Sequence, residues 1–215
     1  MAKVILILAL LSLAFSGELS AQQERIDSGP IVDRIRETVF TLNGYVSEMV
    51  GECQNQDRTA CYHNRIHCRK AALILFVGGG ESYEVDGVHK DPVRMETAFI
   101  SPSGTKSIKS QFMKVYFNKL IGLVSGDNTR YTKVSITSSE YVVIYLGSLH
   151  KIEDNLYECV CTFGEWVYGE HGEIVVYKNY TQKNVKCYVS IVETDAAKEY
   201  KILLGDMKCI ESHKL

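Results

Sequence analysis

The C-terminal half of the chain is a succession of short segments rich in β-branched residues and tyrosine, beginning near Thr129. Polar or glycine-rich connections, such as Glu153-Asp154-Asn155, separate these segments. Short strands joined by tight turns pair in antiparallel order. The chain therefore has to build a sheet from its second half. The predicted strands are Thr129–Thr137, Tyr141–His150, Leu156–Tyr168, Glu173–Tyr180, Asn184–Glu193 and Tyr200–Ile210.

One of these segments shows the alternation of a half-buried strand. Apolar side chains occupy every second position, and polar or aromatic ones stand between them. Because successive side chains of a strand point to opposite faces, this pattern indicates one buried and one exposed face. The apolar positions are Val185, Cys187, Val189 and Ile191, and the intervening ones are Lys186, Tyr188 and Ser190.

The first half of the chain carries helical patterns instead. Between Pro30 and Val50, apolar residues recur at steps of three and four, and Pro30 suits the first position of a helix. We predict a helix from Pro30 to about Val50 and a shorter one from Arg58 to Arg69. The apolar positions of the first helix are Ile31, Ile35, Val39, Leu42, Val46 and Met49.

Two strands and a third helix are predicted between these regions. Ala71–Val77 is a short apolar run stopped by three glycines, which favours a strand, with Ser82–Val88 as its hairpin partner. Ile108–Leu123 again has apolar residues at helical spacing. Helices gathered at the start and strands at the end predict an α+β fold in which N-terminal helices pack on a curved antiparallel sheet.

This order of elements resembles the nuclear-transport-factor-2-like (NTF2-like) family. The similar features are the helix at Pro30–Val50, the strand pair after Arg69, the helix around Ile108–Leu123 and the terminal strands. The resemblance implies a cone-shaped fold with a cavity, in which some members use a pocket Asp or His for acid–base chemistry. A lipocalin-like barrel is the alternative, and the helix at Ile108–Leu123 counts against it.

The N-terminus has the pattern of a secretory signal peptide. Lys3 precedes an apolar run from Val4 to Phe15, which is too short to span a membrane, and cleavage sites lie near Ser16 and Ala21. Residues 1–21 are therefore the predicted signal peptide, and 22–215 a single α+β domain that is secreted to the extracellular space. No later run of 18 apolar residues predicts a transmembrane helix. The balance of 24 basic and 26 acidic residues gives no basic footprint for nucleic acid.

Export decides how the seven cysteines are interpreted, because disulfides are the default in an oxidising compartment. For the late group we predict bridges Cys161–Cys187 and Cys159–Cys209. In the early group, Cys53 pairs with Cys61 or Cys68, which leaves one of the three unpaired. That thiol is either buried or links two chains as a homodimer. Export also makes the sequon at Asn179 a candidate glycosylation site.

The segment Cys61–Cys68 has a second interpretation. On a helix, His63 and His67 lie one turn apart and could share a zinc ion, with sulfur from the flanking cysteines. The alternative is a disulfide-anchored helix whose histidines face solvent. Export favours the alternative, so no metal or other cofactor is predicted.

Glu165 is the most unusual single residue of the predicted sheet. It falls on the apolar face that carries Tyr157, Cys159, Cys161 and Phe163. Either a bulge at Gly164–Trp166 turns it away, or its carboxylate faces the interior. In the second case Glu165 is the candidate catalytic group.

The leading functional hypothesis is a secreted, disulfide-stabilised and non-catalytic protein that binds a small apolar ligand or an extracellular protein. One alternative is a secreted enzyme of isomerase or dehydratase type that uses a pocket carboxylate. Another is a secreted effector or structural protein that dimerises through the odd cysteine. The sequence contains no Gly-x-Ser-x-Gly nucleophile motif.

Overall fold

The computed structural model describes residues 28–52, 57–100, 106–124, 131–144, 149–193 and 197–214. Within these residues, helices come first and the long strands last. The elements are α2 (Ser28–Val50), α3 (Arg58–Ile74), the 3-10 turn η1 (Val77–Gly80), β1 (Tyr83–Val85), β2 (Val88–Lys90), β3 (Arg94–Ile100), β4 (Lys106–Phe112), α4 (Met113–Gly122), β5 (Lys133–Ile144), β6 (His150–Glu153), β7 (Leu156–His171), β8 (Ile174–Glu193) and β9 (Lys198–Lys214).

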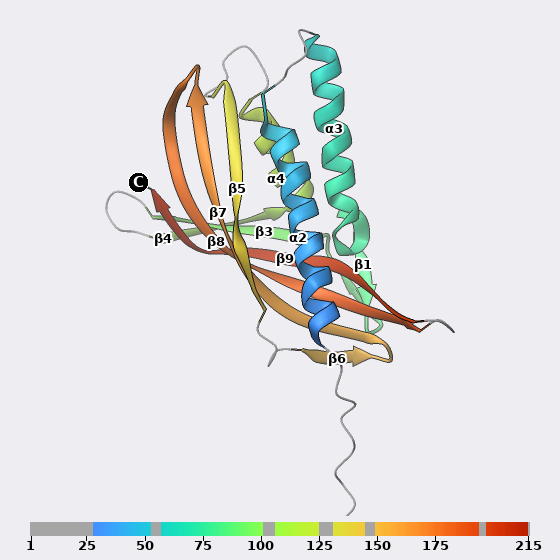
Figure 1. Cartoon of the computed structure of the whole chain (residues 1–215). Helices are drawn as coiled ribbons and strands as arrows, with labels where there is room; N and C mark the ends of the chain where they lie inside the picture. Colours follow the sequence, from blue (N-terminus) through green and yellow to red (C-terminus); the bar gives the residue numbers. More distant parts are fainter. Residues whose placement is uncertain are drawn as a thin grey trace, which may run out of the picture.

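The main sheet is open and strongly curved (Figure 1). Its strand order is β4-β3-β9-β8-β7-β5, with β6 beside β7. All neighbouring pairs are antiparallel except β3 and β9, which are parallel. Because β4 and β5 form opposite edges, the described strands do not close into a barrel, and the lipocalin-like alternative is wrong. The α+β class is confirmed.

The helices cover one face of this sheet (Figure 1), called the inner face below. The predicted apolar positions of α2 are all at most 8% exposed and join one hydrophobic core with residues of α3, α4 and the sheet. The helix prediction for Pro30–Val50 is thereby confirmed. None of the described helices is both long and apolar enough to span a bilayer.

The predicted strand at Ala71–Val77 is wrong, because α3 continues through most of it to Ile74. Cys68, Ala72 and Leu73 are buried on one face of the helix, so tertiary packing extends it beyond Arg69. The predicted partner strand Ser82–Val88 is confirmed only for β1, Tyr83–Val85, and it pairs with β2 rather than with Ala71–Val77. That segment contains a two-residue turn at Asp86-Gly87, where positive φ angles of 53° and 64° favour the tight hairpin of β1 and β2.

The helix predicted at Ile108–Leu123 begins later than expected. The chain runs as strand β4 to Phe112 and becomes helical only at Met113. Ile108 fits the helical spacing, but it is a strand residue with 67% exposure. Strand β3, which pairs with β4, was not predicted, since the sequence Arg94–Ile100 has no clear strand periodicity.

The predicted strands Glu173–Tyr180 and Asn184–Glu193 form one continuous strand, β8. The prediction of a connection between them is wrong. In the structure, Thr181 and Lys183 are buried on the inner face and keep the alternation of the strand.

Candidate functional site

A charged pair is buried beneath the helices on the inner face of the sheet. Glu165 lies on β7 and is 3% exposed. It keeps its register opposite Thr181 of β8, so no bulge turns it outward. The bulge predicted at Gly164–Trp166 is not found there. The pairing of β7 with its neighbour β5 instead shifts register on the β5 side, between Ser138 and Val142. Of the two sequence interpretations of Glu165, the inward-facing carboxylate is the one observed.

Lys183 of β8 supplies the positive charge of the pair. Its Nζ donates a hydrogen bond to Oε1 of Glu165, and it is 6% exposed. Because Lys183 stands opposite Phe163, the two charged residues are diagonal neighbours on one face. Lys183 was missed by sequence reasoning. The sequence pattern that could have found Lys183 is the alternation of inward-facing residues at Val185, Cys187, Val189 and Ile191. Extended back by one step, this alternation places residue 183 on the inner face as well.

Tyr116 of α4 completes the cluster from the helical side, because it lines the same small void as Glu165 and Lys183. Burial raises the pKa of the Tyr116 hydroxyl, and the nearby Lys183 charge opposes this only in part. Burial is the largest single influence and would lower the pKa of Lys183. The charge of Glu165 and its hydrogen bond, together with smaller contributions from other neighbours, outweigh it, so the net pKa is raised. Lys183 therefore stays charged and Tyr116 stays neutral at physiological pH.

The void beside this cluster is very small. The space open to a water-sized sphere is about 10 Å³, roughly the room that one water molecule needs. Asn43 of α2 and Phe117 of α4 close it on one side, and Phe163 and Met207 close it on the other. Ligand pockets for drug-sized molecules measure about 300–1,000 Å³. The space beside the ion pair is therefore too small for a substrate. A larger groove of about 690 Å³ lies elsewhere in the described part of the chain, between α2 and the adjacent ends of β8 and β9.

The chemistry open to this cluster is therefore limited. A general base must reach the proton that it abstracts. The Glu165 carboxylate is instead engaged by the Lys183 ammonium and enclosed by side chains. Within the described stretches, no group of three or more His, Cys, Asp and Glu residues is placed to hold a metal ion. The cluster is an ionic element of the core.

The late cysteines are not disulfide-bonded in the structure, so the predicted bridges are not formed there. For Cys159–Cys209 the strand register gives the reason. Cys159 stands opposite Cys187, whereas Cys209 stands opposite Lys183 on the far side of β8. The two residues are thus about 13 Å apart along the strands and about 10 Å apart across them. A disulfide needs a Cα separation below about 7 Å.

Cys161 and Cys187 are much closer. They are diagonal neighbours on the inner face, and their sulfur atoms are 3.7 Å apart. Both are fully buried. The predicted Cys161–Cys187 pairing is therefore sterically accessible, although the two thiols are unbonded in the structure.

The early cysteines lie on or near α3. Cys61 is disulfide-bonded, whereas Cys68 is a free thiol buried on the core side of the helix. Burial and the negative charge of Glu48 raise the pKa of Cys68. Cys53 lies outside the described residues, so its pairing with Cys61 stays a prediction.

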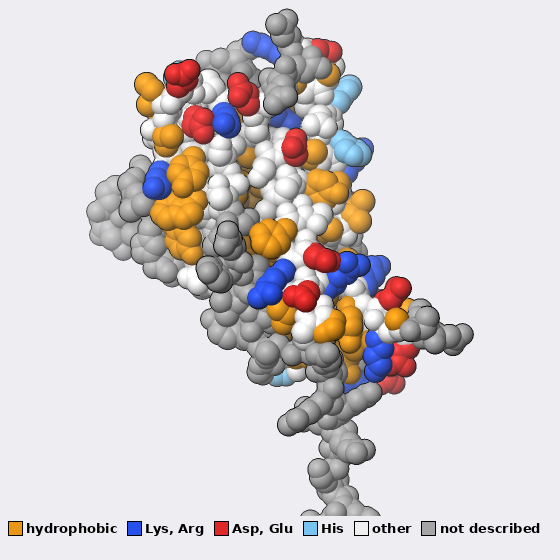
Figure 2. Space-filling view, in the orientation of Figure 1, with side chains coloured by type: hydrophobic (Ala, Val, Ile, Leu, Met, Phe, Trp, Pro, Cys, Tyr) orange, Lys and Arg blue, Asp and Glu red, His pale blue; other side chains and the backbone are white. Residues whose placement is uncertain are grey.

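The histidines of α3 do not meet the cysteines. His63 and His67 are exposed, while Cys68 faces the core. Figure 2 shows histidine side chains on the solvent-facing surface over α3. This placement agrees with the helix whose histidines face solvent. Cys61 is disulfide-bonded and Cys68 faces the core, so neither flanking cysteine supplies a thiolate beside these histidines.

Asn179 carries the predicted glycosylation site, but its side chain is buried. Asn179 is 7% exposed, and its Nδ2 donates a hydrogen bond of 3.0 Å to Oγ1 of Thr181. A glycan is attached through this nitrogen and is bulky and hydrated. The packing of the sheet therefore argues against an N-glycan in the folded protein.

The outer face of the sheet carries an aromatic cluster. Trp166 and Tyr180 are cross-strand partners on β7 and β8, with ring centroids 5.0 Å apart. Tyr168 stacks on Trp166 at 6.3 Å, and Nζ of Lys178 lies 4.7 Å from the centre of the Trp166 ring. We call Trp166, Tyr168, Tyr180 and Lys178 the aromatic platform.

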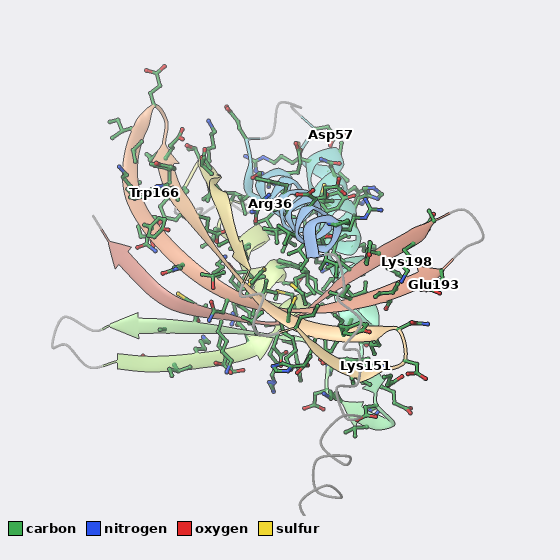
Figure 3. All side chains as sticks on the ribbon, turned by 60° about the horizontal axis from the view of Figure 1, so that its bottom comes forward. Arg36, Asp57, Lys151, Trp166, Glu193 and Lys198 are labelled. Carbon is green, nitrogen blue, oxygen red and sulfur yellow. The ribbon has the colours of Figure 1, made fainter. Side chains whose placement is uncertain are left out.

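The platform is accessible and has a fixed shape. All four residues are half-buried, and Figure 3 shows Trp166 on the side of the sheet away from α2 and α3. The Tyr180 ring lies over Gly164, where any Cβ would collide with its hydroxyl. Cross-strand polar contacts border the platform on the same face, including Thr162–Asn184 and Lys186–Glu158.

No protein-family model matches the chain, and no curated protein matches its sequence.

The buried pair predicts an asymmetric response to mutation. Removing one partner leaves an unpaired buried charge, which typically costs about 3–5 kcal/mol of unfolding free energy. We expect Lys183→Met and Glu165→Leu each to lower stability by about this amount in urea unfolding. The double variant should lose much less, because a well-packed apolar pair often replaces a buried ion pair without loss.

Lys114→Met is the control, since the exposed Lys114–Glu81 ion pair should contribute less than about 1 kcal/mol. Wild-type stability in Lys183→Met, or additive losses in the double variant, would contradict the interpretation of the cluster as one coupled element.

The burial of Asn179 predicts that the folded protein carries no glycan at that position when it is expressed through a eukaryotic secretory pathway. Mass spectrometry of the folded protein from eukaryotic cell culture should show the same mass before and after enzymatic deglycosylation. The matched control is Gly172→Asn with Ile174→Thr, which places a sequon at the exposed β7–β8 turn, where Gly172 has a positive φ that Asn tolerates. Full occupancy of Asn179 in folded protein would overturn the prediction.

Proposed function

We propose that the chain is a secreted, non-catalytic binding protein that contacts an extracellular protein through the aromatic platform. The observation that carries the proposal is the contrast between the two faces of β7 and β8. Around Glu165 and Lys183 the described side chains of the inner face leave a void of only about 10 Å³, whereas the outer face presents an ordered aromatic surface.

The composition of the platform suits protein recognition. Trp and Tyr are the residue types that most often dominate binding energy at protein interfaces, because they bury a large area with few rotatable bonds. The rings of Trp166, Tyr168 and Tyr180 are already held by one another and by Lys178. A partner therefore meets a surface that needs little ordering on binding.

A small apolar ligand is the weaker half of the original hypothesis. The void beside Glu165 and Lys183 has only about 10 Å³, and its walls include these two charges. An apolar molecule would have to displace core side chains and leave these charged groups against a nonpolar surface. The larger groove between α2 and β9, about 690 Å³, is lined by charged side chains such as Arg34, Glu37 and Lys201, which do not suit an apolar molecule.

The two alternative functions have less support for similar reasons. An isomerase or dehydratase would need Glu165 open to substrate, but the carboxylate is paired and enclosed. Dimerisation through an unpaired Cys68 would need an accessible thiol, but this thiol is 6% exposed.

We further propose that helices and sheet together form an NTF2-like cone. Support comes from the strand order β4-β3-β9-β8-β7-β5, the single parallel pair β3–β9 and the helices on one face of a curved sheet. Secretion rests on the apolar run Val4–Phe15 with its flanking Lys3 and small residues.

The test is partner capture from extracellular fluid of the source, using immobilised wild-type protein and the platform variant Trp166→Ala/Tyr180→Ala. Tyr62→Ala is the matched control, because Tyr62 is an exposed aromatic residue on α3, far from the platform in the sequence and on another element. All three proteins are first compared by circular dichroism and thermal unfolding.

We expect one protein partner to be retained by wild type and Tyr62→Ala, and its recovery to fall at least about tenfold for the platform variant, since hot-spot residues contribute 2 kcal/mol or more. Equal recovery on the folded platform variant would contradict the proposal. So would a co-purified small molecule, detected by native mass spectrometry, as the only ligand.

A further inference from the structure

Three buried thiols meet on the inner face of β7 and β8. Cys159 and Cys161 belong to β7, and Cys187 belongs to β8. They are 3%, 0% and 0% exposed, so the three side chains lie inside the core rather than at its margin. We call these three residues the thiol cluster.

Cys187 is the member that both others contact. It stands directly opposite Cys159 in the strand register, and its Sγ lies 3.7 Å from Sγ of Cys161. Its hydrogen bonds to both residues, together with burial, raise the pKa of Cys187, and the bond from Cys187 lowers the pKa of Cys159. Cys187 therefore has two candidate partners at once.

The two cysteines of β7 are poor partners for each other. Their Cα atoms are two residues apart on one strand, a separation of about 6.7 Å, which is near the upper limit for a disulfide. The other two described cysteines without a disulfide bond are not suitable partners for Cys187. Cys209 of β9 stands opposite Lys183, four residues along β8 from Cys187, and Cys68 lies on helix α3. The cluster can accommodate a single bridge, and Cys187 has to be one end of it.

We propose that the thiol cluster is an exchangeable disulfide site, in which Cys187 bonds to either Cys161 or Cys159 and the third cysteine remains a resident thiol. The inference does not depend on the aromatic platform, but it requires an oxidising environment.

The oxidation is an ordinary thiol–disulfide exchange. A small-molecule disulfide such as oxidised glutathione accepts two electrons and two protons and leaves as two thiols, while two protein sulfurs form one bond. Closing the 3.7 Å separation to the S–S bond length of about 2.05 Å is a side-chain adjustment. Because the site is buried, the reaction takes place before the helices cover the sheet.

Exchange between the two bridges is also balanced. The resident cysteine, as a thiolate, attacks the sulfur of Cys187 and displaces the other β7 cysteine, which takes up the proton that the attacking thiol released. No electron leaves the cluster. Losing one β7 cysteine therefore does not abolish the bridge, because the remaining one takes its place.

The experiment is non-reducing peptide mapping of full-length mature protein refolded in a glutathione redox buffer, with free thiols alkylated under denaturing conditions. The buffer supplies the oxidant, so a failure of the secretion proposal would leave this test intact. The variants are Cys159→Ala, Cys161→Ala and Cys187→Ala, with Cys68→Ala as the matched buried control.

We expect one cluster disulfide in wild type and in Cys68→Ala. Cys161→Ala should contain a Cys159–Cys187 bridge, Cys159→Ala should contain a Cys161–Cys187 bridge, and Cys187→Ala should contain neither. Reductant should lower the thermal midpoint of every bridged variant further than that of Cys187→Ala.

Three outcomes would overturn the proposal. The first is wild-type protein whose three cluster thiols are all alkylated after oxidation. The second is a variant lacking Cys159 or Cys161 that forms no bridge although it folds. The third is a Cys159–Cys161 bridge in Cys187→Ala, which would show that Cys187 is not the necessary partner.

Discussion

The alternation of side chains along β7 and β8 is the constraint on which the rest of the structure depends. Because every second residue faces the helices, the strands place Cys159, Cys161, Phe163 and Glu165 inside and Trp166 outside. A slip of one residue between the strands would exchange the two faces. The positions of the ion pair, the thiol cluster and the aromatic platform on β7 and β8 are thus set by one register.

The buried ion pair strengthens that register. With Glu165 on β7 and Lys183 on β8, a shifted pairing would bury two separated charges, which is far more costly than a shifted apolar contact. Tyr116 of α4 ties the same pair to the helical layer. The cluster therefore specifies how helices and sheet are assembled, a role well attested for buried polar groups in coiled coils.

Much of the fold could be predicted from local patterns. The spacing of Ile31 to Met49 gave α2, and the alternation around Cys187 gave a half-buried strand. Predictions failed where tertiary packing overrode the local pattern. The apolar run around Ala72 was predicted as a strand, but its burial against the core continues helix α3 through it. Ile108 fits the apolar spacing of a helix, but it lies on an exposed strand. The parallel contact between β3 and β9 joins residues far apart in sequence, and no local signal could indicate it.

The candidate sites show the same division. Glu165 was noticed because it broke the apolar face of its strand, whereas Lys183 was mistaken for part of a connection. The Cys161–Cys187 proximity follows from the strand pairing that the sequence suggested. Cys159–Cys209 failed because it requires the register of β8 against β9, which the sequence does not encode locally.

The central claim is that the protein acts through the outer face of its sheet and keeps its interior closed. Trp166 is the single tryptophan of the chain, so its fluorescence reports on the platform alone. The most direct measurement is the emission of Trp166 during titration with the captured partner, alongside binding measured independently by calorimetry. The account predicts a saturable change in emission with the same affinity as the calorimetric binding. Tight binding that leaves the Trp166 emission unchanged would contradict it.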